Sequence, residues 1–587
     1  MSTRKKHQKE RPTQRAPKPA SPAKSKGSFQ REAITILALV VLTFIVYGSA
    51  TQNGLLNWDD NFYITDSPYL KDLSWEGVKG IFSAYLVGNY HPITLLSYAI
   101  EYEVAGKIDP SLMHLTNVVF HVLNTVLVFL LGRQLLQHHW GGVVVALIFA
   151  LHPMHVESVA WIAERKDVLY TFFFLLSVLA YLRFVCTNSA SVYVLALFFF
   201  ALSLLAKSAA AALAPLLFVL DYWLRRAWSW NLMLEKLPFL AMAIGIGIVA
   251  LSSQAGAMEE TFAPHFPFWQ RPLIVGFALA FYLVRFIVPH GLSAIHPYPT
   301  DPGEALGPYM GPTIGVLLML GSALFFAYRT RTYWRITITG LLFFLITLAM
   351  VLQVLPVGRA IVAERYTYVP YIGLSLVVAQ LVIDTWRHGL GRSSMLSYVP
   401  AVLLVLVLAV FIGVTTRRIH LWKNSFTLFN DMLSKYPDDG LTHYNRGLTN
   451  YNAKNYKASI ADYDACVTYK PDCVPCWFNR GLSYKELGDM PAVVRDMDAT
   501  IRLKADHADA YRNRGNARAM MKDYGGSITD FTAALSYAPQ DTDVMVNRGL
   551  SHYFAQDIEM ACTDWRAAAA QHSRKGASLS KDHCVTP

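Results

Sequence analysis

The stretch best equipped for chemistry is residues 57–63, which follows the first long apolar run and contains the adjacent carboxylates Asp59 and Asp60 among aromatic side chains. Membrane orientation is set by Lys and Arg, and acidic residues contribute little to it, so the pair needs another explanation. One explanation is a solvated turn in which the Asp side chains bond the local backbone. The other is catalysis, because a carboxylate facing an acceptor hydroxyl can act as a general base.

Four further polar groups interrupt apolar segments of the chain. They are His91, the group His152, His155 and Glu157 with the charged run at 164–167, the single Lys207, and Arg359 followed by Glu364 and Arg365. An ionisable side chain at the centre of a membrane helix costs about 2.5–3.5 kcal/mol on insertion scales, and such residues mark sites or pathways by default. We therefore expect these side chains to bind the substrate.

Each group also has a purely structural alternative. His91 and His152 can pair with backbone carbonyls, and Glu364 can form an internal ion pair with Arg365. Lys207 can extend its ammonium group to the membrane interface. These alternatives remain open at the level of sequence.

A metal ion is a further possibility at the histidines. The spacing places His152 and His155 on one helical face, with Glu157 close by, which is compatible with a divalent metal. Pro153 disrupts the helix at that point, however. We therefore predict no metal ion and no other cofactor.

Taken together, the clusters form the minimal equipment for transferring a sugar from a lipid phosphate to an alcohol. Buried Arg and Lys near a membrane face can bind a lipid-linked phosphate and stabilise its negative charge as it leaves. The Asp pair can supply the base. The substrates implied are a polyprenyl-phosphate-linked sugar and a hydroxyl acceptor.

The composition shows what positions these residues. Of the 587 residues 53% are hydrophobic and 16% are charged, the mean hydropathy is +0.30, and long apolar runs recur between 33 and 416. This predicts an all-α protein with a polytopic membrane domain at 32–420, with about 11–13 spans, some of them tilted, broken or re-entrant. The net charge of +11 lies largely in a tail and in short loops, so it does not indicate nucleic-acid binding.

The charge distribution predicts the orientation. Residues 1–31 contain ten Lys or Arg and one acid, which indicates a disordered tail held in the cytoplasm. Residues 52–112, which contain the Asp pair, are then the first extracytoplasmic loop. The basic loops require an odd number of spans, which places the C-terminal domain outside. We expect a multi-pass protein of the inner (cytoplasmic) membrane.

After 421 the sequence repeats. The tripeptide Asn-Arg-Gly begins at 445, 479, 513 and 547, a spacing of 34 residues that is the tetratricopeptide signature. We predict about four such repeats with a leading half-repeat at 421–572, and a flexible tail at 573–587. Between two repeats lies Cys473-Val474-Pro475-Cys476, a single CxxC that is weak evidence for zinc and also compatible with a small disulfide.

The ordered set of motifs resembles the polyprenyl-phosphate-dependent C-type membrane glycosyltransferases, and among them the transmembrane and tetratricopeptide-repeat-containing O-mannosyltransferases. The resemblance covers roughly 33–570 and rests on the motifs Asn57-Trp58-Asp59-Asp60, Asn89-Tyr90-His91-Pro92-Ile93-Thr94, His114-Leu115-Thr116-Asn117, His152-Pro153-Met154-His155-Val156-Glu157, Leu205-Ala206-Lys207 and Ala363-Glu364-Arg365-Tyr366. It implies that Asp59 or Asp60 is the base or orients the acceptor, and that Arg365, Lys207 and Arg359 contact the lipid phosphate. His91 and Ser208 depart from the pattern of the animal relatives.

The leading hypothesis is therefore a membrane glycosyltransferase, mannosyltransferase-like, that modifies Ser or Thr of an exported protein, with the repeats binding the acceptor or a partner. Membrane lipids surround the spans. An alternative from another class is a non-catalytic membrane anchor whose repeats assemble an envelope or pilus-type complex. A third possibility keeps the chemistry but changes the acceptor to a lipid or a polysaccharide.

Overall fold

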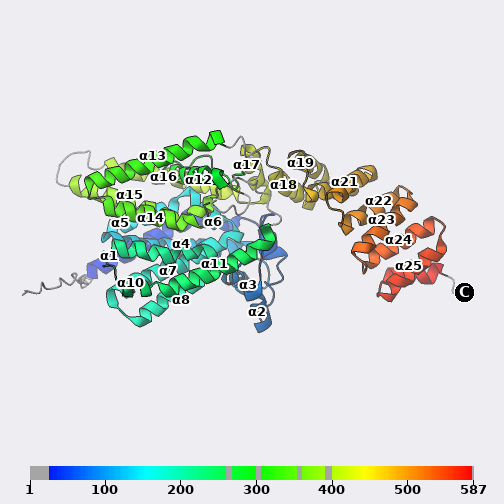
Figure 1. Cartoon of the computed structure of the whole chain (residues 1–587), viewed down its shortest axis with the longest axis horizontal. Coiled ribbons are helices and arrows are strands. Elements are labelled where there is room, and N and C mark those ends of the chain that lie inside the picture. Colours follow the sequence, from blue (N-terminus) through cyan, green and yellow to red (C-terminus); the bar gives the residue numbers. More distant parts are fainter. Residues whose placement is uncertain (1–25, 259–267, 299–305, 353–359, 390–398, 585–587) are drawn as a thin grey trace, which may run out of the picture. The chain divides into compact units, whose positions relative to one another are not determined.

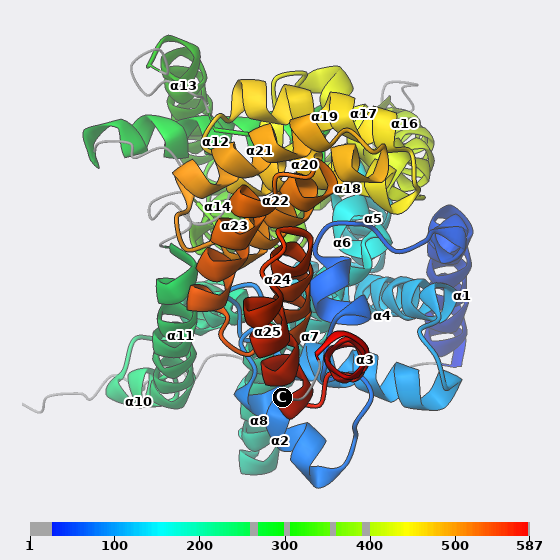
Figure 2. The same cartoon turned by 90° about the vertical axis from the view of Figure 1, so that its right-hand side faces the viewer.

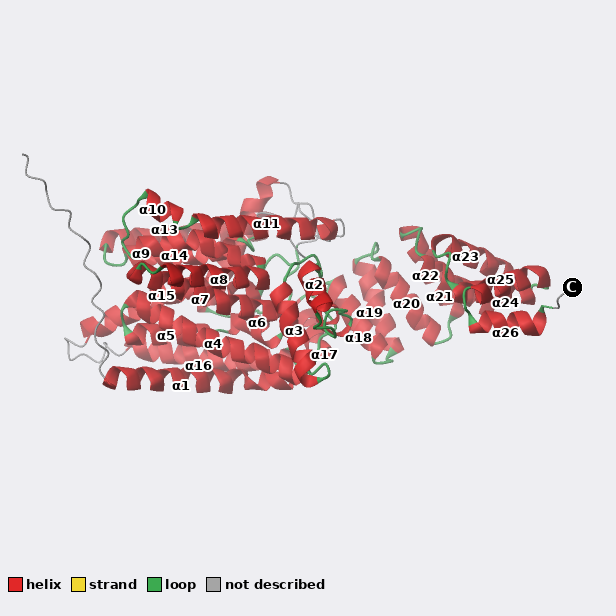
Figure 3. Ribbon diagram, turned by 90° about the horizontal axis from the view of Figure 1, so that it is seen from below, coloured by secondary structure: helices red, strands yellow, loops and turns green. Residues whose placement is uncertain are grey.

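The computed structural model describes residues 26–258, 268–298, 306–352, 360–389 and 399–584. These ranges are built from helices, and the β-type contact they contain is an isolated bridge between Leu86 and Asn89. The predicted all-α class is confirmed (Figure 3). The chain packs into two compact units, with residues 1–52, 67–292 and 298–419 in the first and residues 53–66, 293–297 and 420–587 in the second.

The first unit is a bundle of helices (Figure 1). In chain order its helices are α1 (Lys26–Tyr47), α2 (Trp75–Ser83), α3 (Pro92–Ala105), α4 (Pro110–Leu136), α5 (His139–Leu151), α6 (Val156–Ala160), α7 (Arg165–Thr187), α8 (Ala190–Ala206), α9 (Leu213–Trp223), α10 (Trp230–Leu234), α11 (Leu237–Met258), α12 (Arg271–Ile287), α13 (Leu306–Thr330), α14 (Trp334–Ala349), α15 (Pro370–Gly389) and α16 (Val399–Leu421). The basic tail predicted at 1–31 lies mostly outside the described residues, and its last six residues begin α1.

Among the residues that the structure describes, six helices are long and apolar enough to cross a membrane, and a bent pair makes a possible seventh. The six are Phe29–Gln52, Pro110–Leu136, Ile162–Thr187, Trp230–Ser253, Gly307–Thr330 and Val399–Leu421. Three other apolar helices, Ala190–Ala206, Ser208–Trp223 and Trp334–Ala349, are shorter. The protein is therefore a multi-pass membrane protein, and its described residues contain fewer full-length spans than the 11–13 predicted from the sequence. A helix of 17 residues rises only about 25 Å, less than the roughly 30 Å of a bilayer core.

The breaks in the helices fall at the polar motifs. Helix α5 ends at Leu151, and the chain turns by 57° before continuing as α6, because Pro153 follows His152. Helix α8 ends at Ala206, and Lys207 separates it from the next helical segment. The prediction of broken helices is confirmed by the bent pair. Both breaks expose backbone and polar side chains inside an otherwise apolar bundle, which is tolerated only where protein or a cavity surrounds them.

Close backbone contact holds the bundle together where small residues meet. Between α14 and α15, a Cβ added to Gly340 would lie 2.6 Å from the carbonyl oxygen of Gly373. Any larger residue at Gly340 would push the helices apart. Small residues at helix crossings replace the hydrophobic driving force that is missing between helices in lipid.

The second unit contains the repeats, whose successive helices pack side by side (Figure 2). Its helices are α17 (Ser425–Lys435), α18 (Gly440–Asn452), α19 (Tyr456–Tyr469), α20 (Val474–Glu486), α21 (Met490–Leu503), α22 (Ala508–Met520), α23 (Tyr524–Tyr537), α24 (Thr542–Phe554), α25 (Ile558–Ala570) and α26 (Arg574–His583). The glycine of each Asn-Arg-Gly motif lies at a helix crossing. A Cβ on Gly447 would come within 2.8 Å of the Tyr463 ring, so the repeat requires glycine here.

The arginine of each motif connects neighbouring helices. Its guanidinium donates to the aspartate 16 residues later, and its other edge reaches the residue 16 positions earlier. The aspartate contacts are Arg446–Asp462 at 2.6 Å, Arg480–Asp496 at 2.7 Å, Arg514–Asp530 at 2.6 Å and Arg548–Asp564 at 2.6 Å. This arginine ladder links each repeat to the helix before it.

The segment expected to be a flexible tail is ordered. Ser573 caps α26 through its side chain, and a disulfide joins Cys562 on α25 to Cys584 just after α26. The prediction of a frayed end at 573–587 is therefore wrong for the described part. The polar composition of this segment is that of the outer face of a capping helix, which terminal repeats need.

Candidate functional site

The first unit gathers six charged side chains from four separate parts of the chain. We call this group the charge cluster: Glu157 on α6, Glu164, Lys166 and Asp167 at the start of α7, Lys207 after α8, and Arg365 in the turn before α15. It contains three acids and three bases. The breaks at 153 and 207 are what bring these residues inside the bundle.

Direct contacts join the members of the charge cluster. Nζ of Lys207 lies 2.5 Å from Oδ1 of Asp167 and 3.5 Å from Oε2 of Glu164. Nζ of Lys166 lies 3.1 Å from the other oxygen of Glu164. The Arg365 guanidinium pairs with Glu157 and lies 3.3 Å from Glu164, and its backbone N–H donates to Glu157 at 3.0 Å. Lys207 is therefore paired, and the alternative of a snorkelling lysine is not what the structure has.

The acids and the bases differ in accessibility. The side chains of Glu157, Glu164 and Asp167 are 0–3% exposed. Those of Lys207 and Arg365 are 14% and 20% exposed. The three carboxylates are therefore buried, as is Lys166, whereas Lys207 and Arg365 are the more accessible groups of the cluster. An arrangement of this kind can accept an anion from the accessible side.

His91 adjoins the charge cluster. It precedes α3, and the hydroxyl of Thr94 on the first turn of that helix donates to the carbonyl of Ala206, next to Lys207, at 3.0 Å. His91 is 4% exposed, and among the described residues neither of its ring nitrogens has a hydrogen-bond partner. Burial lowers its pKa well below the ordinary value, and the charges of Lys166 and Lys207 lower it further. A neutral, buried imidazole without partners is costly unless a ligand uses it.

His152 has a different role. One of its ring nitrogens accepts from the Met154 backbone, and the other contacts the Phe286 carbonyl at 3.2 Å. Its ring packs among aromatic side chains, including Tyr371 and Phe411 at 4.8 and 4.6 Å between centroids. The alternative of a histidine satisfied by the backbone therefore describes His152.

His155 is bonded on one side only. Its Nδ1 contacts the Phe149 carbonyl at 2.8 Å, and its other nitrogen is buried without a partner among the described residues. Its ring lies 5.7 Å from that of His152 and 5.0 Å from that of Tyr368. It belongs to an aromatic layer beside the charge cluster.

Glu364 pairs with a residue that the sequence did not suggest. Both its oxygens accept from Arg418 on α16 at 2.8 Å, and Glu364 is fully buried. The structural alternative of an ion pair between Glu364 and Arg365 is not what the structure has, because Arg365 pairs with Glu157. Arg359 lies outside the described residues.

The Asp pair belongs to the second unit. The segment 53–66 packs on the first repeat helices: the backbone N–H of Asn57 donates to Ser425 at 2.8 Å, and its side chain donates to Asn445 and Thr449 at 3.2 Å each. The Trp58 ring lies 6.3 Å from that of Phe429. The loop is thus fixed to α17 and α18 and is no free turn.

The two aspartates differ in their surroundings. The carboxylate of Asp60 is fully buried and accepts from the backbone N–H of Leu56 at 2.8 Å, which closes its own turn. Asp59 is only partly buried, and its backbone carbonyl accepts from Phe62 and Tyr63. Asp60 therefore shapes the loop, whereas the side chain of Asp59 has solvent access.

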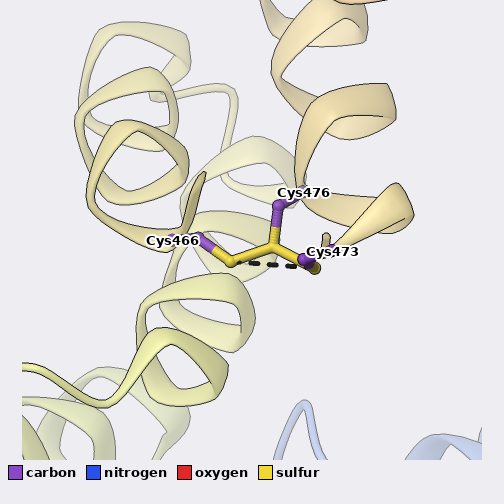
Figure 4. A group of neighbouring side chains, drawn as sticks. All are labelled: Cys466, Cys473 and Cys476. Atoms are coloured by element: carbon purple, nitrogen blue, oxygen red, sulfur yellow. Dashed lines mark hydrogen bonds between the residues drawn. A yellow bond between two sulfur atoms is a disulfide. The ribbon is translucent and has the colours of Figure 1, made fainter. Parts of the chain in front are cut away.

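A cysteine cluster lies between the first two repeats (Figure 4). The sulfurs of Cys466, Cys473 and Cys476 lie within 4.8 Å of one another, and all three residues are buried. The sulfur of Cys476 is close enough to form a disulfide with either Cys466 or Cys473. Because one sulfur forms only one disulfide, one of these two cysteines remains a free thiol. Three thiolates also suit a soft metal ion. The sequence missed Cys466 because it precedes the CxxC by a turn that only folding closes.

The sequence singled out the charged run at 164–167, but it did not show that Glu164, Lys166 and Asp167 would meet Lys207 and Arg365. The signal was present, since four consecutive charged residues begin an otherwise apolar helix. The fourth, Arg165, bonds Glu101 at 2.6 Å and Asn117 at 2.9 Å and is fully buried, so it braces the bundle.

Comparison with known proteins places two family segments on the chain. Residues 92–252 match the family described as dolichyl-phosphate-mannose-protein mannosyltransferase, and residues 442–473 match the tetratricopeptide repeat. The first segment contains His91's neighbours on α3 and most of the charge cluster. The predicted resemblance and the tetratricopeptide prediction are confirmed.

Similar curated proteins are O-mannosyl-transferases. Protein O-mannosyl-transferase TMTC3 of Homo sapiens is 22% identical over 428 residues, which are 65% of this chain and 45% of that protein. Protein O-mannosyl-transferase Tmtc1 of Drosophila melanogaster is 38% identical over 96 residues, 16% of this chain and 11% of that protein. The chain thus spans less than half the length of these relatives.

Solved structures with a similar part include the MamA protein, at 15% identity over 28% of this chain and 86% of that one, with a TM-score of 0.25. Another is YrrB, titled a TPR protein with an unusual peptide-binding site, at 14% identity over 34% of this chain and 99% of that one, with a TM-score of 0.26.

Proposed function

We propose that the chain is an integral-membrane glycosyltransferase that moves a sugar, mannose by similarity to its relatives, from a polyprenyl phosphate to a hydroxyl of an exported protein. The observation that carries this proposal is the charge cluster within the mannosyltransferase-like segment. Its cations Lys207 and Arg365 are partly accessible, and buried carboxylates position them. Such a site suits a lipid phosphate.

The proposed roles follow from charge. The phosphate of the donor binds to Lys207 and Arg365, with Lys166 and the neutral His91 beside them. When the bond between the sugar carbon and the phosphate oxygen breaks, the phosphate takes the electron pair, and the cations stabilise the added charge. Hydrogen bonds in which the donor or the acceptor is ionised are roughly twice as strong as those between neutral groups.

For the acceptor we propose Asp59. Its carboxylate takes the proton of the attacking hydroxyl as the new bond to the sugar carbon forms. Asp60 is assigned the structural role, because its carboxylate is buried against the Leu56 N–H. His152 and Glu364 are not included in the proposed site. The ring nitrogens of His152 bond backbone groups, and the carboxylate of Glu364 pairs with Arg418.

The repeats are proposed to bind the protein acceptor or a partner on the outer side of the membrane. Support comes from the Cys562–Cys584 disulfide, since such bonds persist in oxidising compartments. The basic N-terminal residues favour a cytoplasmic start of α1. These features support the proposal that the protein lies in the inner membrane of a bacterial cell.

The test is an assay of the purified full-length protein with polyprenyl-phosphate mannose and a Ser/Thr-rich acceptor protein. Asp59→Asn and Lys207→Met are each expected to lower kcat by about a hundredfold or more. Asp60→Asn is expected to lower the thermal unfolding temperature as well. Lys107→Gln serves as control, because Lys107 is a lysine of the same unit that is 72% exposed.

Two outcomes would contradict the proposal. Full activity of Asp59→Asn would remove the proposed base. Absence of transfer by the wild-type protein with every lipid-phosphate sugar, together with unchanged glycans in a deletion strain, would favour the scaffold alternative.

A further inference from the structure

A second basic site lies in the first unit, away from the charge cluster. A pocket of about 530 Å³ opens where the end of α9 meets α10 and the start of α14. Its polar lining consists of Asp221, Tyr222, Arg225, Arg226 and Arg335, and Trp228 is among its apolar lining residues. Neither the resemblance nor the proposed reaction uses any of these residues.

The charges in this pocket do not cancel. Asp221 accepts from Lys236 at 2.5 Å and from Arg226 at 3.1 Å, and Glu235 pairs with Arg226 at 2.8 Å. These two acids and two bases neutralise one another.

Arg225 and Arg335 have no carboxylate at ion-pair distance among the residues that the structure describes. The pocket therefore keeps two positive charges. Arg335 lies over the Tyr222 ring at 4.7 Å, and this cation–π contact holds its guanidinium at the wall of the pocket. Two arginines in one concavity suit a phosphate group, which guanidinium binds through paired N–H donors.

The surroundings indicate a membrane lipid. Trp228 is 73% exposed and Trp230 is 85% exposed, and the neighbouring Leu234 and Leu237 are also exposed. Exposed tryptophans beside leucines are typical of the membrane interface, where the ring lies at the level of the head groups. Basic pockets between membrane helices on the cytoplasmic side bind anionic head groups.

The position within the first unit separates this pocket from the proposed donor site. Helices α9 and α10 lie at the end of the bundle where α1 begins, and α2 and α3 lie at the other end (Figures 1 and 3). His91 precedes α3, so the charge cluster and the pocket are at different depths of the bundle.

We propose that this pocket binds the phosphate of an anionic membrane phospholipid through Arg225 and Arg335. The acyl chains extend along the exposed apolar side chains of α10 and α11. Binding at this site anchors the α9–α10 corner at the membrane surface and does not require the glycosyltransferase activity.

The chain offers a variant that removes a charge without harm to the fold. Arg225 follows the last turn of α9 with φ 57°, a left-handed conformation that favours glycine. Arg225→Gly therefore removes the guanidinium and relieves the backbone at once. Arg335→Gln removes the second charge, and the double variant combines them.

The experiment is native mass spectrometry of the full-length, detergent-purified protein with added phosphatidylglycerol, phosphatidylcholine or inorganic phosphate. The wild type is expected to retain phosphatidylglycerol, and the double variant to bind it at least tenfold more weakly. The control is Arg329→Gln with Arg331→Gln, which removes two exposed arginines at the C-terminal end of α13 that do not line the pocket. This control is expected to bind like the wild type.

Three results would overturn the proposal. The first is equal phosphatidylglycerol binding by the double variant and the wild type. The second is an equal loss in the Arg329 and Arg331 control, which would mean unspecific attraction to the basic end. The third is inorganic phosphate displacing phosphatidylglycerol at equal concentration, which would mean that the ligand is a soluble phosphate. Thermal unfolding of each variant accompanies the measurement, and Arg225→Gly alone repeats the test if the double variant unfolds.

Discussion

The arginine ladder of the repeats allows a stability prediction to be worked out from the structure. Arg480 donates to both oxygens of Asp496 at 2.7–2.8 Å and to Asp464 at 2.7 Å. The Asp496 side chain is 0% exposed, and that of Arg480 is 9% exposed. Replacing Arg480 by Met would leave the buried Asp496 carboxylate with only the longer contact to Arg495, at 3.5 Å, and breaking a buried pair from one side costs about 3–5 kcal/mol.

The contact between Arg480 and the exposed Asp464 provides the matched control. Asp464 is 54% exposed, so Asp464→Asn is expected to cost no more than about 1 kcal/mol. Replacing both buried partners, Arg480→Met with Asp496→Leu, should recover much of the loss, because an apolar pair of similar volume avoids the desolvation of both charges.

The assay is urea and thermal unfolding of a fragment beginning at residue 420, followed by circular dichroism. For a domain of this size, 1 kcal/mol corresponds to about 2–4 °C in Tm, so Arg480→Met is expected to lower Tm by about 6–20 °C. A loss as small as that of Asp464→Asn would refute the reasoning. It would show that water reaches Asp496 or that the repeats relax around it.

Three further predictions follow from single contacts. Glu364→Gln should lower the unfolding temperature of the solubilised protein, because it weakens the buried pair with Arg418, whereas an ordinary surface substitution changes stability by less than about 0.5 kcal/mol. In the repeats, burial alone would raise the pKa of Asp462, but hydrogen bonds to His443 and Arg446 outweigh it and lower the pKa. Because the pKa is lower in the folded state, ionised Asp462 stabilises the fold above pH 3.8, and this stabilisation is lost as the pH falls through the folded pKa. Asp462→Asn should therefore make the free energy of unfolding less dependent on pH in acid. Cys476→Ser should remove both the Cys466–Cys476 and the Cys473–Cys476 bond, since Cys476 is the shared partner.

The controls for these predictions use the same chain. Proteolysis before Asp472 separates Cys466 from the other two cysteines, so mass spectrometry distinguishes a Cys466–Cys476 bond from a Cys473–Cys476 bond. A protein that retains all three thiols and one bound metal ion per chain would contradict the disulfide. For Asp462, an unchanged acid unfolding curve in the variant would show that another carboxylate dominates.

The sequence by itself determined the parts that depend on local patterns. A 34-residue period specifies paired helices, because each repeat buries its apolar face only against its neighbours. Long apolar runs specify membrane helices, and Pro153 specifies the break after α5. These features need no information about distant contacts. The lengths of the apolar runs did not reveal how many helices are long enough to cross a bilayer, because the positions where helices break or end early depend on packing.

Only the tertiary structure decided which charges meet. Glu157, Glu164 and Lys207 are far apart in the chain from Arg365, and no periodicity relates them. Sequence proximity even suggested the wrong pair: Arg365 is adjacent to Glu364 but bonds Glu157, while Glu364 bonds Arg418.

The aspartate loop shows the same limit. Asp59 and Asp60 are equivalent by composition, yet the backbone turn buries one carboxylate and leaves the other accessible. The fold also joined their loop to the first repeat through Asn57. The physical reason is that burial and pairing of a charge depend on what surrounds it in three dimensions, and a sequence pattern records only what is nearby along the chain.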